Sequence, residues 1–270
     1  MKLPPEFAFS QGVLQDYVDC PRRFQLRYAQ AVAWPALPAE PALEREAQLR
    51  LGTQFHRLVQ QHQLGLSVDR LSALAAEPPL EAWWQRYLDH GPAGLPAQRH
   101  PEVALWAPLG GYRLLAKYDL LALEVGARAL IVDWKTGRQR PRRAWLERRL
   151  QTRVYRYVLV KAGHALNGGA PWEAEQVEML YWFANAPQSP ERLGYDAQQF
   201  AADEAYLKGL VRAIERASED DFPQTEDERR CLFCAYRSWC DRGVEAGDFR
   251  QNELEQAFDL ELDDLGEIAF

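Results

Sequence analysis

The sequence lacks the features of a secreted or membrane protein. Only four of its 270 residues are cysteine, and the opening segment MKLPPEFAFSQG contains two prolines where a signal peptide has a continuous apolar stretch. No apolar run approaches the ~20 residues that a membrane-spanning helix needs. We therefore expect a cytoplasmic protein with no membrane partner, whose cysteines bind metal rather than form disulfides.

Internal repeats and a Walker A loop are also absent, so unwinding of nucleic acid would need a partner. The net charge of −7, taken alone, disfavours a nucleic-acid partner. The charge is unevenly distributed, however. Residues 135–161 contain ten Lys and Arg against one acid, whereas residues 244–270 contain nine acids and one Arg. The basic segment is either a solvated helix face or a local nucleic-acid footprint.

Apolar periodicity predicts the order of helices and strands. The predicted helices cover residues 44–65, 142–163 and 196–217, and the predicted strands cover 102–110, 112–124, 127–136 and 175–184. This order predicts a mixed α/β fold. We expect one domain over residues 1–243 with a helical insert at 66–100, followed by an acidic tail at 244–270.

Two predicted strands form a hairpin that brings like charges together. If the turn is centred on Gly126, the numbers of opposed residues sum to 252, so Asp119 faces Asp133 and Lys117 faces Lys135. Like charges in opposed positions are destabilising. Either a divalent cation binds between the two carboxylates, or both acids are solvated at the strand ends.

Polar residues near this hairpin extend the candidate site. Beside a metal, Lys135 would stabilise negative charge on a phosphoryl group; otherwise it is an exposed partner of Asp133. Gln151 and Tyr155 share one helix face, either reaching the site or lying on the helix surface. His56 is either a nitrogen ligand or a satisfied polar residue.

The cysteines form a second candidate site. The segment CLFCAYRSWC has the spacing C-x2-C-x5-C, and Cys20 lies far upstream. Four thiolates suit an iron–sulfur cluster or zinc, while free thiols are a third interpretation. The aromatic residues Phe233, Tyr236 and Trp239 are available to shield a cluster. Either metal would join residue 20 to residue 231 as a clasp between the chain ends.

The motifs DCPRRFQLRY, LGTQFH, KYD, VDWKTG, QTRVY and CLFCAYRSWC, with an acid at residue 102, occur in an order that resembles the RecB-like PD-(D/E)XK nucleases. The likeness is to the iron–sulfur members, namely the CRISPR-associated RecB-like exonucleases and the nuclease domain of AddB. It implies a restriction-endonuclease-like core with a mixed sheet flanked by helices, a helical lobe and a C-terminal four-cysteine segment. The residue before KYD is Ala116, where relatives commonly have glycine.

The resemblance also implies a role for each motif residue. It implies Mn²⁺ or Mg²⁺ bound by His56, Asp119, Asp133 and the main-chain carbonyl of Trp134. Lys135 would be the catalytic lysine, supported by Gln151 and Tyr155, with Glu102 behind the ligands. A 4Fe–4S cluster, or alternatively zinc, would be held by Cys20, Cys231, Cys234 and Cys240.

We therefore predict a DNA exonuclease that acts on single strands in CRISPR spacer acquisition or in DNA repair and recombination. Its partners would be DNA and a CRISPR integrase or a helicase subunit. The alternative is a non-catalytic DNA-binding or scaffolding subunit. The residues predicted to contact DNA are Arg138, Arg140, Arg142, Arg143, Arg149 and Arg153.

Overall fold

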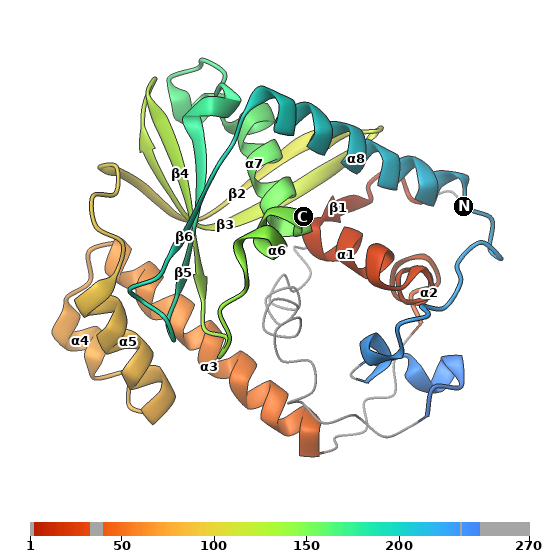
Figure 1. Ribbon diagram of the computed structural model, residues 1–270, viewed down its shortest axis with the longest axis horizontal. Helices are drawn as coiled ribbons and strands as arrows, with labels where there is room; N and C mark the ends of the chain where they lie inside the picture. The colour runs from red at the N-terminus through yellow and green to blue at the C-terminus, as the bar shows by residue number, and fades with distance from the viewer. Residues whose placement is uncertain (1–2, 33–39, 233, 244–270) are drawn as a thin grey trace.

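A computed structural model describes residues 3–32, 40–232 and 234–243 (Figure 1). The predicted acidic tail lies outside the described residues. The helices of eight or more residues are α1 Gln11–Asp19, α3 Glu40–Gln63, α5 Pro78–His90, α7 Leu150–Ala162 and α8 Ala197–Arg216. Shorter α-helices are α2 Pro21–Phe24, α4 Val68–Ser72 and α6 Arg143–Arg148. The strands are β1 Ala8–Ser10, β2 Gln98–Leu109, β3 Tyr112–Glu124, β4 Arg128–Lys135, β5 Val177–Phe183 and β6 Glu191–Gly194.

The strands form one mixed sheet in the order β1-β3-β4-β5-β6, with β2 also paired to β3. β3 is parallel to β1 and antiparallel to β2 and β4, while β5 is parallel to β4 and antiparallel to β6. The mixed sheet flanked by helices confirms the predicted α/β fold class. The β3–β4 hairpin has the predicted register from Glu124 opposite Arg128 to Leu120 opposite Val132. The pairing ends there and does not include the predicted Asp119–Asp133 pair.

Helices cover both faces of this sheet and enclose two cores. α1, α7 and α8 pack on one face, where Ile131 of β4 and Tyr181 of β5 are buried. α3, α4 and α5 pack on the other face over Val132 and Trp182. Alternate residues of β4 and β5 therefore face different cores, as expected for strands buried on both sides. In Figure 1, α3 and α7 lie on opposite sides of the sheet.

Several elements differ from the prediction. The helix expected over residues 142–163 is interrupted at Arg149, which has an extended ψ of 140°. The Thr152 hydroxyl donates to the Leu146 carbonyl at 2.6 Å, so a side chain satisfies a group that a continuous helix would use. The short strands β1 and β6 were not predicted. Among the described residues, no helix is both long and apolar enough to cross a membrane.

Candidate active site and cysteine cluster

An interruption in the β2–β3 ladder creates the first part of the site. Pro101 is opposite Leu120 and Val103 is opposite Tyr118, but the intervening Glu102 and Asp119 are not paired. Glu102 has a positive φ of 55°, which is uncommon for a residue other than glycine. The chain therefore departs from regular pleating in both strands at the same level.

The same irregularity changes which face the β3 side chains point to. Tyr118 and Leu121 are both buried in the α7-side core, while Leu120 is buried in the α3-side core. In a regular strand, residues 118 and 121 would point to opposite faces. The alternation of faces in β3 therefore shifts by one position at Asp119. The β2–β3 register is the same on both sides of this point, so each strand has one unpaired residue and neither has an extra one.

Three metal-binding side chains meet at this point. Ligand atoms of His56 on α3, Glu102 on β2 and Asp119 on β3 all lie within 4.8 Å of one another. All three side chains are partly exposed. A nitrogen and two carboxylates match the ligand preferences of Mn²⁺ and Mg²⁺. The sequence placed Glu102 behind the ligands, whereas the structure places it among the three.

Asp119 is oriented by contacts to both of its carboxylate oxygens. Its Oδ1 lies 3.3 Å from His56 Nδ1, and its Oδ2 accepts a 2.9 Å hydrogen bond from the Trp134 backbone N–H. Burial by itself raises the pKa of Asp119, but the charges of His56 and Lys135 and the two contacts lower it overall. The lowered pKa keeps Asp119 anionic beside the His56 imidazole and near the Lys135 ammonium.

Glu102 has its own anchor. Its Oε2 is 2.7 Å from Lys117 Nζ, in a pair whose side chains are 20% and 40% exposed. The hairpin register extended to residue 117 would place Lys117 opposite Lys135. The β3–β4 pairing ends at Leu120 instead, so the two lysines are not opposed. Lys117 forms an ion pair with Glu102, and Lys135 forms one with Asp133.

Asp133, Lys135 and Gln151 form a buried polar group beneath the metal-binding residues. Lys135 Nζ is 2.7 Å from Asp133 Oδ2, and both side chains are 2% exposed. Gln151 Nε2 donates to Asp133 Oδ1 at 2.7 Å. Asp133 and Lys135 share a strand face with Ile131, so they approach from the α7 side. Lys135 is close enough for its charge to act on Asp119, but Asp133 is not among the three side chains whose ligand atoms lie within 4.8 Å of one another.

Tyr155 and Trp134 have their rings in the two cores. Tyr155 packs 5.1 Å from the Tyr118 ring, and its carbonyl accepts a hydrogen bond from the Tyr118 hydroxyl at 2.9 Å. The Trp134 ring packs between Tyr87 and Trp182, so only its backbone remains for a contact with metal. Tyr155 therefore contacts Tyr118, the residue directly before Asp119, through both its ring and its carbonyl.

Gly52 allows α3 to approach the end of β4. A Cβ atom at this position would lie 3.3 Å from Thr136 Oγ1, which is tighter than an ordinary contact. Gly52 and His56 are one helical turn apart and lie on the same side of α3. The motif LGTQFH thus contains both Gly52, which permits α3 to pack closely on the end of β4, and His56, which this packing brings next to Glu102 and Asp119.

Sequence reasoning missed two residues that contact the segment from Asp133 to Gly137. The Tyr181 ring lies 5.7 Å from Lys135 Nζ, and Tyr181 is opposite Asp133 in the β4–β5 register. Asn185 donates to the carbonyls of Thr136 and Gly137 at 3.1 Å and so anchors the turn after Lys135. Both contacts depend on β5 pairing with β4, and no local sequence pattern indicates them.

The six predicted DNA-binding arginines are in different environments. Arg140 and Arg143 both form ion pairs with Glu191, and Arg153 pairs with Asp203 at 3.3 Å. Arg149 stacks on the Trp145 ring at 4.6 Å. Arg138 and Arg142 are exposed. Carboxylates therefore offset half of the set, and DNA contact by these arginines remains a prediction.

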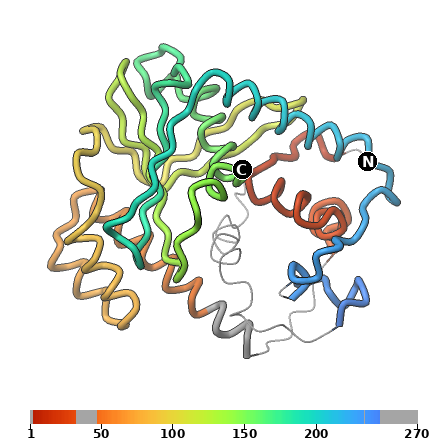
Figure 2. The backbone as a smooth tube through the Cα atoms, in the orientation of Figure 1, coloured from red at the N-terminus to blue at the C-terminus, as the bar shows by residue number. Residues whose placement is uncertain are grey.

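The cysteines lie where the two ends of the described chain meet, as the red and blue segments of Figure 2 show. Asp19, next to Cys20, is 2.6 Å from Arg230, next to Cys231. Gln25 Nε2 donates to the Glu219 carbonyl at 2.7 Å. Burial raises the pKa of the thiols of Cys231, Cys234 and Cys240, and the nearby Cys20 raises each further.

The four sulfurs are not gathered as tightly as the ligands of a bound zinc ion. All four cysteines belong to the described residues, and no three of their sulfurs lie within 4.8 Å of one another. Tetrahedral zinc with Zn–S bonds of ~2.3 Å would bring them to about 3.8 Å apart. Of the aromatic residues expected to shield the site, Tyr236 is buried, Trp239 is 54% exposed and Phe233 lies outside the described residues.

Comparisons with known proteins identify one family. Residues 8–241 match the sequence profile of the PD-(D/E)XK nuclease superfamily. A crystal structure named "Putative exonuclease", from Eubacterium rectale, matches with a TM-score of 0.50 and 9% identity, covering 84% of this chain and 91% of that one. The crystal structure of SSO0001 matches with a TM-score of 0.41 and 14% identity, covering 90% and 89%. A search of curated proteins gave no match. The likeness to the Eubacterium rectale structure concerns the fold alone.

Proposed function

Because the chain belongs to the PD-(D/E)XK nuclease superfamily, we propose that it is a metal-dependent deoxyribonuclease that hydrolyses phosphodiester bonds. The observation that carries this proposal is the meeting of His56, Glu102 and Asp119 from three separate elements. It is supported by the buried ammonium of Lys135, whose charge acts on Asp119. A surface that only bound DNA would have no need to bury a lysine beside a group of metal-binding carboxylates.

The proposed ligands of the divalent cation are His56, Glu102 and Asp119, with Asp133 and the Trp134 carbonyl as the further donors that the family resemblance implies. The nitrogen ligand favours Mn²⁺ over Mg²⁺. A cation bound here would activate water and neutralise the charge of the scissile phosphate.

The chain's own residues supply orientation and charge. The Trp134 N–H and His56 fix both oxygens of Asp119, and Lys117 fixes Glu102. Gln151 and Asp133 hold Lys135 in place, so its ammonium is preorganised to stabilise the charge that grows on the phosphoryl group. This preorganisation avoids rearrangement during the reaction.

We propose that the four cysteines hold a 4Fe–4S cluster. Two observations support a shared metal site: the thiols lie close enough to raise one another's pKa, and they join segments distant in sequence. The choice of a cluster follows the motif resemblance. Zinc is the alternative. A brown preparation with visible absorption supports the cluster, and a colourless zinc-containing one contradicts it.

The finer assignment rests on the motif order. We propose a single-stranded DNA exonuclease of the cytoplasm, working with a CRISPR integrase in spacer acquisition or with a helicase in repair. The exposed Arg138 and Arg142 lie beyond the turn that follows Lys135, a position suited to guiding a strand's phosphates.

A cleavage assay on end-labelled single and double strands tests the activity. With Mn²⁺ or Mg²⁺, the wild-type protein should shorten labelled single strands, and Asp119→Asn should lose at least ~10³-fold in rate because an anionic ligand is removed. Asp89→Asn, at an exposed position on α5, is the matched control and should cleave normally. Normal cleavage by Asp119→Asn would refute the proposal and favour the scaffolding alternative.

Glu102 needs a separate test, since the sequence placed it outside the ligands. If it binds the cation, Glu102→Gln should weaken Mn²⁺ binding by about tenfold or more, measured by calorimetry without DNA. Glu124→Gln, at the exposed end of β3, changes the same group and should bind Mn²⁺ as the wild type does. Equal Mn²⁺ affinities of the two variants would show that Glu102 does not bind the cation directly.

A further inference from the structure

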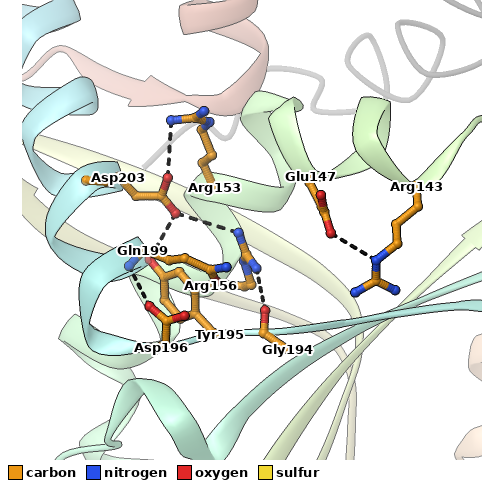
Figure 3. A pocket seen from close by; sticks show the side chains of 10 residues that line it. Arg143, Glu147, Arg153, Arg156, Gly194, Tyr195, Asp196, Gln199 and Asp203 are labelled. Carbon is orange, nitrogen blue, oxygen red and sulfur yellow. Dashed lines mark hydrogen bonds and ion pairs between the residues drawn. The ribbon is translucent and has the colours of Figure 1, made fainter.

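A polar cavity of about 450 Å³ lies between α6, α7, α8 and the end of β6 (Figure 3). Arg143 comes from α6, Arg153 and Arg156 from α7, and Asp203 from α8. Among the described residues that line it, none is a proposed metal ligand or a member of the Asp133–Lys135 pair. Its volume is within the range of small-molecule sites.

Arg156 is held rigidly at the wall of the cavity. Its side chain is 5% exposed, its Nε donates to the Thr152 carbonyl at 3.1 Å, and its Nη1 donates to the Gly194 carbonyl at 2.8 Å. The third nitrogen, Nη2, is 3.8 Å from Asp203 Oδ2, which is beyond hydrogen-bond distance. Arg156 therefore retains N–H donors that its protein partners do not use.

Arg153 has a similar unused donor. Its Nη1 lies 3.3 Å from Asp203 Oδ1, while its Nε is buried without a hydrogen-bond acceptor in the described part of the chain. A buried donor without an acceptor is unfavourable unless a ligand satisfies it. Figure 3 shows both guanidinium groups directed toward the single carboxylate of Asp203.

The charged groups of the cavity are unevenly paired. Of its three acids, Glu147 pairs with Arg143 and Asp196 accepts a hydrogen bond from the Gln199 backbone N–H. Arg153 and Arg156 therefore share the single carboxylate of Asp203. Burial raises the pKa of Asp203, although the charges of Arg156 and Arg153 oppose the shift. Planar guanidinium groups with free N–H donors match the oxygens of a phosphate.

We infer that this cavity binds the phosphate group of a deoxynucleoside 5′-monophosphate, with Arg153 and Arg156 as its donors. The inference rests on the proposed function for the identity of the ligand, because exonucleolytic cleavage releases mononucleotides. Asp196 and Gln199 at the cavity wall supply polar groups for the sugar and base. The site would retain or sense product away from the proposed active site.

Calorimetric titration of the full chain with its cysteine site loaded, without added divalent cation, tests this inference. The ligands are thymidine 5′-monophosphate, thymidine, inorganic phosphate and a short oligothymidylate. The monophosphate should bind at least tenfold more tightly than thymidine. Arg153→Gln should weaken its binding at least tenfold, whereas Arg148→Gln, the same charge change outside the cavity, should bind normally.

Weaker binding by Arg153→Gln could also result from misfolding, so a second variant is chosen that should bind the monophosphate more tightly than the wild type. Asp203→Asn keeps an acceptor for Tyr195 but removes the competing charge, so it should tighten monophosphate binding about threefold to tenfold. Unchanged binding in both Arg153→Gln and Asp203→Asn would overturn the inference. So would the absence of binding by the wild type, equal binding of thymidine, or preferential binding of inorganic phosphate or the oligonucleotide.

Asp119→Asn separates this site from the proposed nuclease. It should lose cleavage yet bind the monophosphate as the wild type does. Loss of binding in this variant would place the ligand at the active site and overturn the inference. If wild-type cleavage is absent but binding depends on Arg153, the nuclease proposal fails and the cavity assignment stands.

Discussion

The two sets of metal-binding side chains are supported in different ways. His56, Glu102 and Asp119 extend from a long helix and two long strands that are packed against large cores. Three of the cysteines instead belong to residues 231–240, where the short 3₁₀ helices Glu228–Cys231 and Arg237–Cys240 bury none of their own residues. The first set is preformed by the fold, and the second holds a segment with little core of its own.

This difference indicates whether the free energy of metal binding contributes to catalysis or to folding. Ligands on a preformed scaffold contribute to catalysis with little change in stability, whereas ligands that join weakly packed segments contribute to folding. Substitutions at the two sites should therefore affect different measurements.

The largest effect is expected at Cys20. Cys20→Ser should abolish the visible absorption of the cluster and lower the unfolding free energy by at least ~3 kcal/mol, roughly 10 °C in melting temperature. Val18→Ser, at an exposed position two residues earlier, is the control and should melt within a few degrees of wild type. A Cys20→Ser protein as stable as this control would contradict the structural role of the clasp.

Lys135 should affect both activity and stability, because it is a proposed catalytic residue and is also buried. Lys135→Met should reduce cleavage by at least ~10³-fold and lower the unfolding free energy by ~3–5 kcal/mol, since Asp133 remains as an unpaired buried carboxylate. Combining it with Asp133→Leu should recover at least ~2 kcal/mol but no cleavage. Denaturant unfolding and the cleavage assay measure both. A double variant no more stable than Lys135→Met would argue against the buried charge as the cause.

The smallest effect is expected at Gly52, where a substitution should change cleavage but hardly change stability. In Gly52→Ala, the new methyl group meets Thr136 and displaces His56 slightly, so cleavage should fall roughly threefold. Its unfolding free energy should stay within ~1 kcal/mol of wild type, because the gain in helix propensity offsets the contact. Gly209→Ala on α8 meets no atom within 4 Å; it should stabilise the protein by ~0.5–1 kcal/mol and leave cleavage unchanged. Equal cleavage by both variants would show that close α3 packing is unimportant.

Local patterns predicted the hairpin well. A hairpin centred on Gly126 between two apolar runs led to the β3–β4 register observed from Glu124 to Leu120, because a tight turn restricts pairing. It did not predict that the pairing would end before Asp119 and Asp133. The interruption at Glu102 and Asp119 was not predictable in this way, since it arises between strands that pair across a separate turn. The break at Arg149 likewise depends on a side-chain hydrogen bond within the folded chain.

The sequence by itself determined the chemical types of the donors, their order and the α/β class, because residue identity and short-range periodicity are properties of neighbours in the chain. Only the tertiary structure decided that Glu102 joins His56 and Asp119, that Gln151 contacts Asp133, and that two arginines share Asp203. These contacts require α3 and α7 to pack on the sheet and α8 to pack beside α7, and such packing depends on long-range contacts that no local pattern encodes.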